Sequence, residues 1–458
     1  MDDRIDRVYM VVEKLETAGG VAEQVTLLAT ELMQRGIDVW VFARRVLGRD
    51  NQYALRLRGA GVHVASCPTW LYGLDPRPTW PARSALVRGL IWLTYPVLAP
   101  IALFDARLRR RSVSASWAGA VGWTRGQLGA VILRDLLDDA FRALLDRHAA
   151  ESPPDVVDVS GLDYLQGVAW ARGHGYPTVY RQTSLPSTDE PLTEQQVADL
   201  RRATCLMAVS RAAASRLRSL LGDDRPIRVV PNAVPDPGRR EDRGNGHHGP
   251  SFEGALVVCL SRLSEEKGVQ CIPEVARRVL RAAPGARFLV AGDGPLRRSL
   301  EQRCRALRLG DAVRFLGDLP HESALDLLRQ ADVMFLPSRR EGMPVTAIES
   351  MALSRAMVVT SVGGTPELVQ GGASALLVPP DDVDAMARAL LRVISDPALR
   401  QRLGHAARLA YERGPYRPHT VADLTLTVYR RALDTTAAAE LRPVTMAGGG
   451  LRAEESGW

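Results

Sequence analysis

Glycines and charged residues gather after five predicted strands in the C-terminal half of the chain. In chain order, the loops after these strands read SRLSEEKG (261–268), AGDGP (291–295), GDL (317–319), SRREGMP (338–344) and GGTPE (363–367). The carboxyl ends of parallel strands meet at one edge of an α/β sheet, and ligands bind beyond that edge. We therefore expect the five loops to form one shared site.

The residue types in these loops suit a ligand that carries a diphosphate. Arg262 and Lys267 supply fixed cations, and the turn from Gly363 into the following helix can supply backbone amides at a helix N-terminus. Taken alone, the two cations would be ordinary surface charges. Their place at a strand end, within this set of loops, favours phosphate binding.

Two glutamates in the same region occupy different settings. Glu349 lies in the apolar stretch AIESMAL, where an unpaired carboxylate is costly, so we favour a functional role over a solvated helix position. Its carboxylate is suited to accept hydrogen bonds from the hydroxyls of a ribose. Glu341 lies in the loop before that helix, where we expect it to face a sugar.

Strands and helices alternate through both halves of the chain, which predicts an α/β fold built on parallel, doubly wound sheets. The N-terminal half opens with a strand at 8–13, a loop that ends in Gly19 and Gly20, and a helix from about 21 to 35. The stretch PDPGRREDRGNGHHGP (235–250) combines Gly, Pro and charge without a hydrophobic period, which is typical of an exposed linker. We therefore expect two domains.

The segment from Glu341 to Glu349 is an E-x7-E motif, preceded by SRLSEEKG and followed by GGTPELV. An isolated E-x7-E carries no signal, but this ordered set resembles family 4 of the glycosyltransferases. The resemblance runs through nearly all of 253–411 and, more weakly, through AGGVAEQVTLLATELMQRGIDV and VVPNAV in the N-terminal half. It implies the GT-B fold, with two Rossmann-like domains facing across a cleft, and sugar transfer with retention of anomeric configuration.

The resemblance also implies roles for single residues. Arg262 and Lys267 would hold the diphosphate of a nucleotide sugar, most simply a UDP- or GDP-sugar, and Glu349 its ribose. Glu341 would contact the donor sugar and act with the two cations in catalysis. The other implied donor contacts are Gly19, Gly20, Gly292, Leu319, Gly342, Met343, Pro344, Gly363, Gly364 and Thr365.

The domain assignment follows from the linker and the resemblance together. We expect an acceptor-binding domain at 1–235, with an atypical apolar and basic region at about 84–130, and a linker at 236–252. A nucleotide-sugar domain would span 253–415, a helix at 416–436 would pack back on the N-terminal domain, and a disordered tail would follow at 437–458.

The N-terminal half departs from the family pattern. Family members often carry histidines after the strands that here read VVDVS and TVYRQTS, whereas this chain offers Asp158 and Gln182 as acceptor-side contacts. The acceptor is expected to be a sugar, a lipid-linked molecule or a small metabolite. Two alternatives remain: an inactive, sugar-nucleotide-binding subunit, and another GT-B enzyme such as an epimerase or phosphorylase, although no lysine motif for pyridoxal phosphate is evident.

Charge and cysteine content bear on the partners, the cofactors and the compartment that we expect for this protein. The net charge is +7, but no nucleic-acid motif accompanies it, and the five cysteines form no zinc-like cluster. We expect a reduced, cytoplasmic protein that needs no metal or other cofactor, with Asp382 and Asp384 starting a helix rather than binding a metal. Residues 89–104 carry no charge and precede several arginines. A buried insertion is favoured over peripheral docking on the membrane, and the segment is too short to span it.

Overall fold

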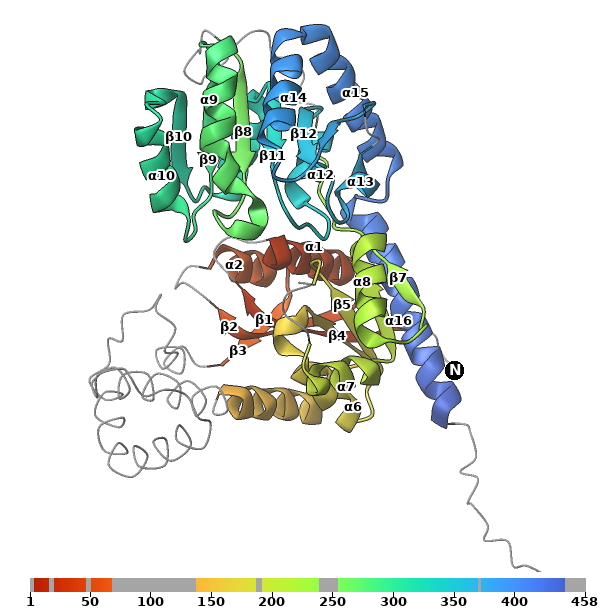
Figure 1. The fold of residues 1–458 in the computed structure, drawn as a ribbon. Coiled ribbons are helices and arrows are strands. Elements are labelled where there is room, and N and C mark those ends of the chain that lie inside the picture. Colours follow the sequence, from red (N-terminus) through yellow and green to blue (C-terminus); the bar gives the residue numbers. More distant parts are fainter. Residues whose placement is uncertain are drawn as a thin grey trace, which may run out of the picture.

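The computed structural model describes residues 4–15, 20–46, 51–67, 137–186, 192–238, 254–369 and 372–440. These residues form two α/β domains stacked on one another (Figure 1). Gly19, the segment 89–104, the rest of the atypical region at 84–130 and most of the linker and tail lie outside the described residues. Within the described part, no helix combines the length and the apolar character that a membrane span requires.

The N-terminal domain is built on a seven-stranded sheet of order β3-β2-β1-β4-β5-β6-β7, in which every pair of strands is parallel. Its strands are β1 (Arg7–Leu15), β2 (Asp38–Val46), β3 (His63–Ser66), β4 (Val156–Ser160), β5 (Thr178–Gln182), β6 (Cys205–Ala208) and β7 (Ile227–Val229). Its helices are α1 (Gly20–Gln34), α2 (Gln52–Gly59), α6 (Gln166–Gly173), α7 (Glu194–Arg202) and α8 (Arg211–Leu221), with a further helix at 137–151 and the short η1 (Leu162–Tyr164).

The C-terminal domain repeats this plan with a six-stranded parallel sheet of order β10-β9-β8-β11-β12-β13. Its strands are β8 (Leu256–Leu260), β9 (Arg287–Ala291), β10 (Val313–Gly317), β11 (Val333–Leu336), β12 (Ala356–Thr360) and β13 (Leu376–Val378). Its helices are α9 (Ile272–Ala282), α10 (Arg297–Ala306), α11 (His321–Gln330), α12 (Val345–Ala352), α13 (Thr365–Leu368), α14 (Val383–Ser395) and α15 (Pro397–Arg413), with the short η2 (Glu265–Lys267), η3 (Val269–Cys271) and η4 (Gly310–Ala312). The predicted fold class is confirmed.

The central strands are apolar almost throughout because both faces of each sheet are covered. All five residues of β4, β8 and β12 are buried, as expected for parallel strands between two helical layers. In the N-terminal domain, α1, α2 and α16 (Pro418–Glu440) cover one face, and the helix at 137–151 with α6 covers the other. In the C-terminal domain, α12 and α15 face α9 and α14 across the sheet.

In each sheet the order in which strands are added reverses once, at β1 and at β8. Each such reversal marks a place where a ligand can bind. The chain adds β2 and β3 on one side of β1 and β4 to β7 on the other, and β9 and β10 on one side of β8 and β11 to β13 on the other. Crevices form beyond the carboxyl ends of the strands at such switch points. The loops after β8 and β11 therefore border one crevice.

Two chain crossings connect the domains, and they are bonded to each other. The Val234 N–H donates to the Tyr416 carbonyl at 2.7 Å, and the Tyr411 hydroxyl donates to the Val234 carbonyl at 2.9 Å. Arg408 of α15 donates to both carboxylate oxygens of Asp236, at 2.9 and 2.7 Å. After the second crossing, α16 descends along the N-terminal domain (Figure 1), packing against α1 and the sheet.

Candidate functional site

The two loops at the C-terminal switch point are joined by a charged pair. The Lys267 ammonium nitrogen lies 2.8 Å from Oε1 of Glu341, and the Ser338 hydroxyl donates to the same oxygen at 2.7 Å. Glu341 and Ser338 are buried, whereas Lys267 is half-buried. An ammonium group has three donors. One donor of Lys267 is used by Glu341, so the pair still presents a cation to a ligand.

The loops come this close because glycine stands where a side chain would collide. Gly363 has a φ of +51°, and a Cβ on it would lie 1.9 Å from the Glu341 carbonyl oxygen. Gly268 has a φ of +62°, and its Cβ would lie 2.0 Å from the Pro337 carbonyl oxygen. Positive φ combined with backbone contact admits only glycine at such places. These two glycines therefore allow the loops after β8 and β12 to contact the loop after β11.

Glu349 lies buried in α12, one turn of helix beyond the crevice loop. Nδ1 of His321, the first residue of α11, is 3.7 Å from its Oε1. Burial, opposed by His321 and reinforced by the carboxylate of Glu23 in α1, raises the pKa of Glu349 to about 7. A buried carboxylate with a raised pKa beside a crevice is a candidate binding-site group.

Some of the hydrogen-bonding groups in the turn after β12 already have partners within the protein. The amides of Gly364 and Thr365 donate to the carbonyls of Glu341 and Val362 at 3.1 and 3.0 Å. The Thr365 hydroxyl is buried and, within the described part of the chain, has no hydrogen-bond partner. An unbonded buried hydroxyl is costly. This hydroxyl is therefore the group of the turn that a bound anion would satisfy.

The remaining predicted donor contacts of the C-terminal domain lie in loops near strand ends and differ in exposure. Arg262 is exposed in the loop after β8, and Leu319 packs partly buried against the core. The Gly292 amide donates to the Gly317 carbonyl at 2.8 Å and so joins the loops after β9 and β10. Pro344 precedes α12 as its N-cap residue. Gly19 lies outside the described residues.

The N-terminal domain closes directly on these loops. A Cβ on Gly342 would lie 2.9 Å from Cα of Ser184, and one on Gly364 would lie 2.8 Å from Cβ of Ser210. Gly20, at the start of α1, faces Val345 at 3.7 Å by the same construction. The structure therefore places Gly20, Gly342 and Gly364 at the contact between the domains.

The predicted acceptor-side residues occupy internal positions. Asp158 is fully buried, and its Oδ2 accepts from Arg181 at 2.8 Å and from the Tyr429 hydroxyl at 2.6 Å. Gln182 is also fully buried, donating to the Ser184 carbonyl and accepting from Tyr180. For Asp158 the reason is α16, which covers the sheet face to which this carboxylate points and supplies Tyr429. Gln182 is held instead by its bonds to Tyr180 and Ser184. In this structure neither side chain reaches the cleft, which is a correction to the sequence-based assignment.

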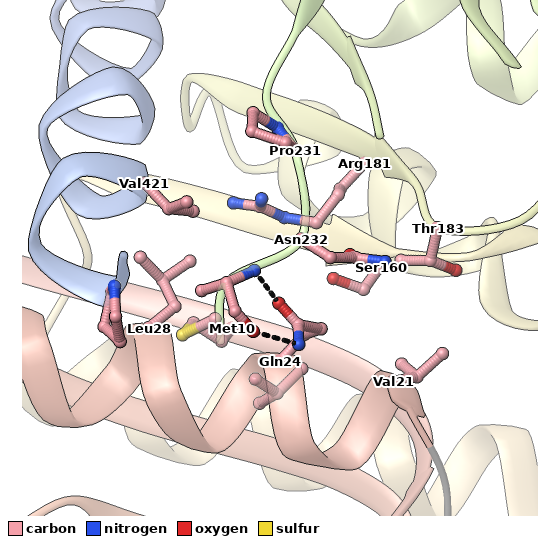
Figure 2. A pocket seen from close by; sticks show the side chains of 13 residues that line it. Met10, Val21, Gln24, Leu28, Ser160, Arg181, Thr183, Pro231, Asn232 and Val421 are labelled. Atoms are coloured by element: carbon pink, nitrogen blue, oxygen red, sulfur yellow. Dashed lines mark hydrogen bonds between the residues drawn. The ribbon is translucent and has the colours of Figure 1, made fainter. Parts of the chain in front are cut away.

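Polar groups beside them do reach a small pocket between α1 and the sheet (Figure 2). Its labelled polar lining residues are Gln24, Ser160, Arg181, Thr183 and Asn232. Gln24 bonds both backbone groups of Ala233 and so fixes α1 to the first crossing. Asn232 donates across the domain contact to the Met343 carbonyl at 2.8 Å. Thr183 is the half-buried member of this group that directly follows the buried Gln182.

Several contributing residues were missed by the sequence analysis. Ser338 and His321 touch the two glutamates, and Asn232 binds the loop that contains Met343. Ser338 follows a strand end, a signal that could have identified it. His321 and Asn232 meet the site only through tertiary structure, so no local pattern could have found them. No cluster of three or more His, Cys, Asp or Glu suited to a metal occurs among the described residues.

Two family models match the chain, one for each domain. The model described as Glycosyl transferase 4-like domain matches residues 19–233, and the model described as Glycosyl transferases group 1 matches residues 247–410. The two matches meet at the linker between the sheets.

Curated relatives include enzymes of Streptomyces. A 2-deoxystreptamine glucosyltransferase of Streptomyces kanamyceticus is 32% identical over 78% of this chain and 88% of its own length. A 2-deoxystreptamine N-acetyl-D-glucosaminyltransferase of Streptomyces fradiae is 29% identical over 92% of each chain. An alpha-D-kanosaminyltransferase of Streptomyces kanamyceticus is 34% identical, but the match spans only 33% of this chain and 39% of that protein.

Solved structures share the whole two-domain arrangement. Sucrose-phosphate synthase from Thermosynechococcus elongatus has a TM-score of 0.66 at 19% identity, covering 94% of this chain and 99% of that one. HepE from Anabaena, solved in complex with UDP-glucose, has a TM-score of 0.63 at 15% identity and the same coverage. At these identities the likeness shows the fold. Together with the family models and the deoxystreptamine relatives, it places this chain among the family 4-type glycosyltransferases of the GT-B fold.

Proposed function

We propose that the protein transfers a sugar from a nucleotide diphosphate sugar to a small polyhydroxylated acceptor, with retention of anomeric configuration. The observation that carries this proposal is the Lys267–Glu341 pair at the switch point of the C-terminal sheet, one helix turn from the buried Glu349. A cation, a carboxylate beside it and a second, buried carboxylate match the needs of a diphosphate, a sugar and a ribose.

The two cations act on the charge that develops as the sugar leaves. The bond between the sugar's anomeric carbon and the diphosphate oxygen breaks, and negative charge accumulates on the diphosphate. The two remaining donors of Lys267 and the exposed guanidinium of Arg262 stabilise that charge. The Thr365 hydroxyl supplies a further donor at the turn after β12. In this proposal the side chains carry the charge compensation, and no metal or other cofactor takes part.

Retention follows if the acceptor attacks from the face that the diphosphate leaves. The acceptor oxygen bonds to the anomeric carbon, and its proton passes to the departing diphosphate oxygen. Glu341, held by Lys267 and Ser338, contacts the hydroxyls of the donor sugar rather than attacking the anomeric carbon. Glu349 accepts from the ribose hydroxyls and so fixes the nucleotide end of the donor.

The relatives support a small acceptor. Relatives that align along 88% or more of their own length include two named as acting on 2-deoxystreptamine, a polyhydroxylated ring, and two named D-inositol 3-phosphate glycosyltransferases. The acceptor would lie against the N-terminal domain beyond β4 and β5, where Ser160 and Thr183 offer hydroxyls. A cyclitol or aminocyclitol is therefore the first acceptor class to test.

The test is a turnover assay over a panel of donors and acceptors. The purified protein is incubated with UDP-, GDP-, ADP- and dTDP-sugars and with 2-deoxystreptamine, myo-inositol or no acceptor, and products are identified by mass spectrometry. The anomeric proton coupling of the product reports retention or inversion. A product of retained configuration from one donor is expected. Donor binding without any product would instead support an inactive sugar-nucleotide-binding subunit, and an inverted product would overturn the retaining mechanism.

A lipid-linked acceptor is the alternative that residues 89–104 raise. Sedimentation with anionic lipid vesicles tests it at the level of the whole protein. We propose a cytoplasmic protein that stays in the supernatant. Co-sedimentation that salt weakens would favour peripheral docking and a lipid-linked acceptor instead.

A further inference from the structure

Glu367 bonds the two domains to each other through backbone amides. It lies in α13 of the C-terminal domain, yet its carboxylate accepts from the N–H groups of Arg211 and Ala212 in α8, both at 2.8 Å. Nε of Arg211 lies 3.3 Å from the same carboxylate. The two oxygens are divided between the two amides, so the contact has a fixed orientation. The partners are separated by 156 and 155 residues.

The amides that Glu367 binds have no partner within their own helix. The first N–H groups of any helix lack an intrahelical acceptor and carry partial positive charge. In α8 the hydroxyl of the N-cap Ser210 accepts from the Ala213 amide at 3.0 Å, and its carbonyl accepts from the Ala214 amide at 2.9 Å. The amides of Arg211 and Ala212 are therefore left for an external acceptor, and a carboxylate is the strongest one available.

The same short segment carries the turn expected to meet the donor. Gly363 to Thr365 form the turn after β12, and Glu367 follows within the four residues of α13. The N–H of Glu367 donates to the Gly364 carbonyl at 3.1 Å, so turn and carboxylate move together. Gly364 in turn lies against Ser210 at the start of α8.

We propose that Glu367 is a positioning residue that latches the N-terminal domain in the closed state through the start of α8. The inference rests on the proposed transfer reaction, because closure matters only if an acceptor on one domain must meet a donor on the other. Glu367 does not touch the reacting atoms. It aligns the two halves of the site by fixing α8, and with it Ser210, against the donor turn.

Hydrogen–deuterium exchange at single amides tests the latch without any assay of activity. In the wild type the amides of Arg211 and Ala212 should exchange slowly, although they are the first two of a helix. Glu367→Ala should speed their exchange at least tenfold while leaving the Ala213 amide protected. Ser210→Ala is the matched control, because it should expose the Ala213 amide and spare the other two. Glu367→Gln keeps one oxygen acceptor and should fall between wild type and Glu367→Ala.

Steady-state kinetics then separate the latch from the donor site. Glu367→Ala should lower kcat/KM for transfer by about tenfold, the effect of losing one charge-assisted contact, with little change in nucleotide diphosphate affinity. Glu274→Ala, which removes a surface carboxylate on α9, should leave both unchanged. Unchanged exchange at Arg211 and Ala212 in Glu367→Ala would overturn the latch even if transfer is observed. Faster exchange in a protein that binds no nucleotide would keep the latch and overturn the proposed reaction.

Discussion

The two domains share one fold, but the charged residues on their strands and strand-end loops lie in different environments. In the C-terminal domain, Lys267, Glu341 and Glu349 border the crevice with donor or acceptor capacity left over. In the N-terminal domain, Glu13 is bound by Arg44 and Arg45, and Asp158 by Arg181, all of them buried. The domains differ in whether a member of the charged pair stays accessible: Lys267 is half-buried at the crevice, whereas Asp158 and Arg181 are both buried, although Oδ1 of Asp158 has no hydrogen-bond partner among the described residues.

The largest expected effect is on stability and lies in the N-terminal domain. Asp158→Ala leaves the buried guanidinium of Arg181 without its carboxylate, which should cost about 3 to 5 kcal/mol of folding free energy. Calorimetry should show the melting temperature falling by roughly 10 °C. Asp38→Ala, which removes a half-exposed partner of Arg7, should cost no more than about 1 kcal/mol. Equal losses in the two variants would mean that the Asp158 pair is not a structural element.

In the C-terminal domain the corresponding change should affect catalysis and leave stability nearly intact. Lys267→Ala removes the cation from the crevice, and transfer should slow by a factor on the order of 100 to 1,000, as when one preorganised donor to a developing anion is lost. Initial rates and a melting curve on the same preparation check this. Arg277→Ala, on the outer surface of α9, is the matched control. A Lys267→Ala protein with a lowered melting temperature but the transfer rate of the wild type would contradict the prediction, because Lys267 would then serve stability and not catalysis.

The buried Glu349 should make stability depend on pH. Its pKa is raised from 4.5 to about 7, chiefly by burial, so the folded protein holds this proton more tightly than the unfolded chain. Stability should therefore fall as the pH rises from about 4.5 to 7 and level off above, by at most about 3 kcal/mol.

Melting temperatures measured from pH 5 to 8 provide the check, with Glu349→Gln as the reference that cannot titrate. The difference between wild type and variant should narrow toward low pH, where Glu349 is neutral. His321 and Glu23 face the same carboxylate and are present in both proteins, so their own contributions to stability largely cancel in the difference. A difference that does not change with pH would show that Glu349 has an ordinary pKa.

The smallest effect concerns the contact between the domains. The nearest atoms to a Cβ on Gly342 are the backbone of Ser184 and Leu185, at 2.9 to 3.1 Å, so Gly342→Ala should hold the domains apart. We expect the added methyl group to cost about 1 kcal/mol when the domains close, the low end of overpacking costs. This cost should lower kcat/KM roughly fivefold. Gly173→Ala, at a helical glycine with open space around it, is the control and should be neutral. Steady-state kinetics and small-angle scattering check this prediction. A Gly342→Ala protein with the kcat/KM and the scattering profile of the wild type would contradict it.

The contrast between the domains also explains what the sequence could predict. The donor loops are short motifs that each follow a strand, and parallel topology alone brings them to one edge of the sheet. Glu341, Glu349 and the glycine turn were therefore predicted from local patterns. Ser338 follows a strand end and could have been singled out in the same way, whereas the contact of His321 with Glu349 forms only in the folded chain.

The N-terminal side was harder for a physical reason. Asp158 is the middle residue of the otherwise largely apolar strand β4, and Tyr429, whose hydroxyl donates to its carboxylate, lies 271 positions away. The sequence pattern predicted a helix near 416–436, but not which polar groups it would cover. Glu367 likewise lies in a predicted loop, GGTPE, but its partners in α8 lie more than 150 residues earlier in the chain. Contacts at such separations emerge only from the folded chain.

The central claim is that the strand-end loops of the C-terminal domain hold a nucleotide sugar, and direct calorimetric titration tests it. Intact UDP-, GDP-, ADP- and dTDP-sugars are titrated into the wild type, Lys267→Ala and Glu349→Ala. We predict that one nucleotide binds the wild type and that each variant loses at least about tenfold in affinity, the equivalent of 1.4 kcal/mol. Affinity unchanged in both variants, or no binding of any nucleotide sugar to the wild type at millimolar concentration, would contradict it.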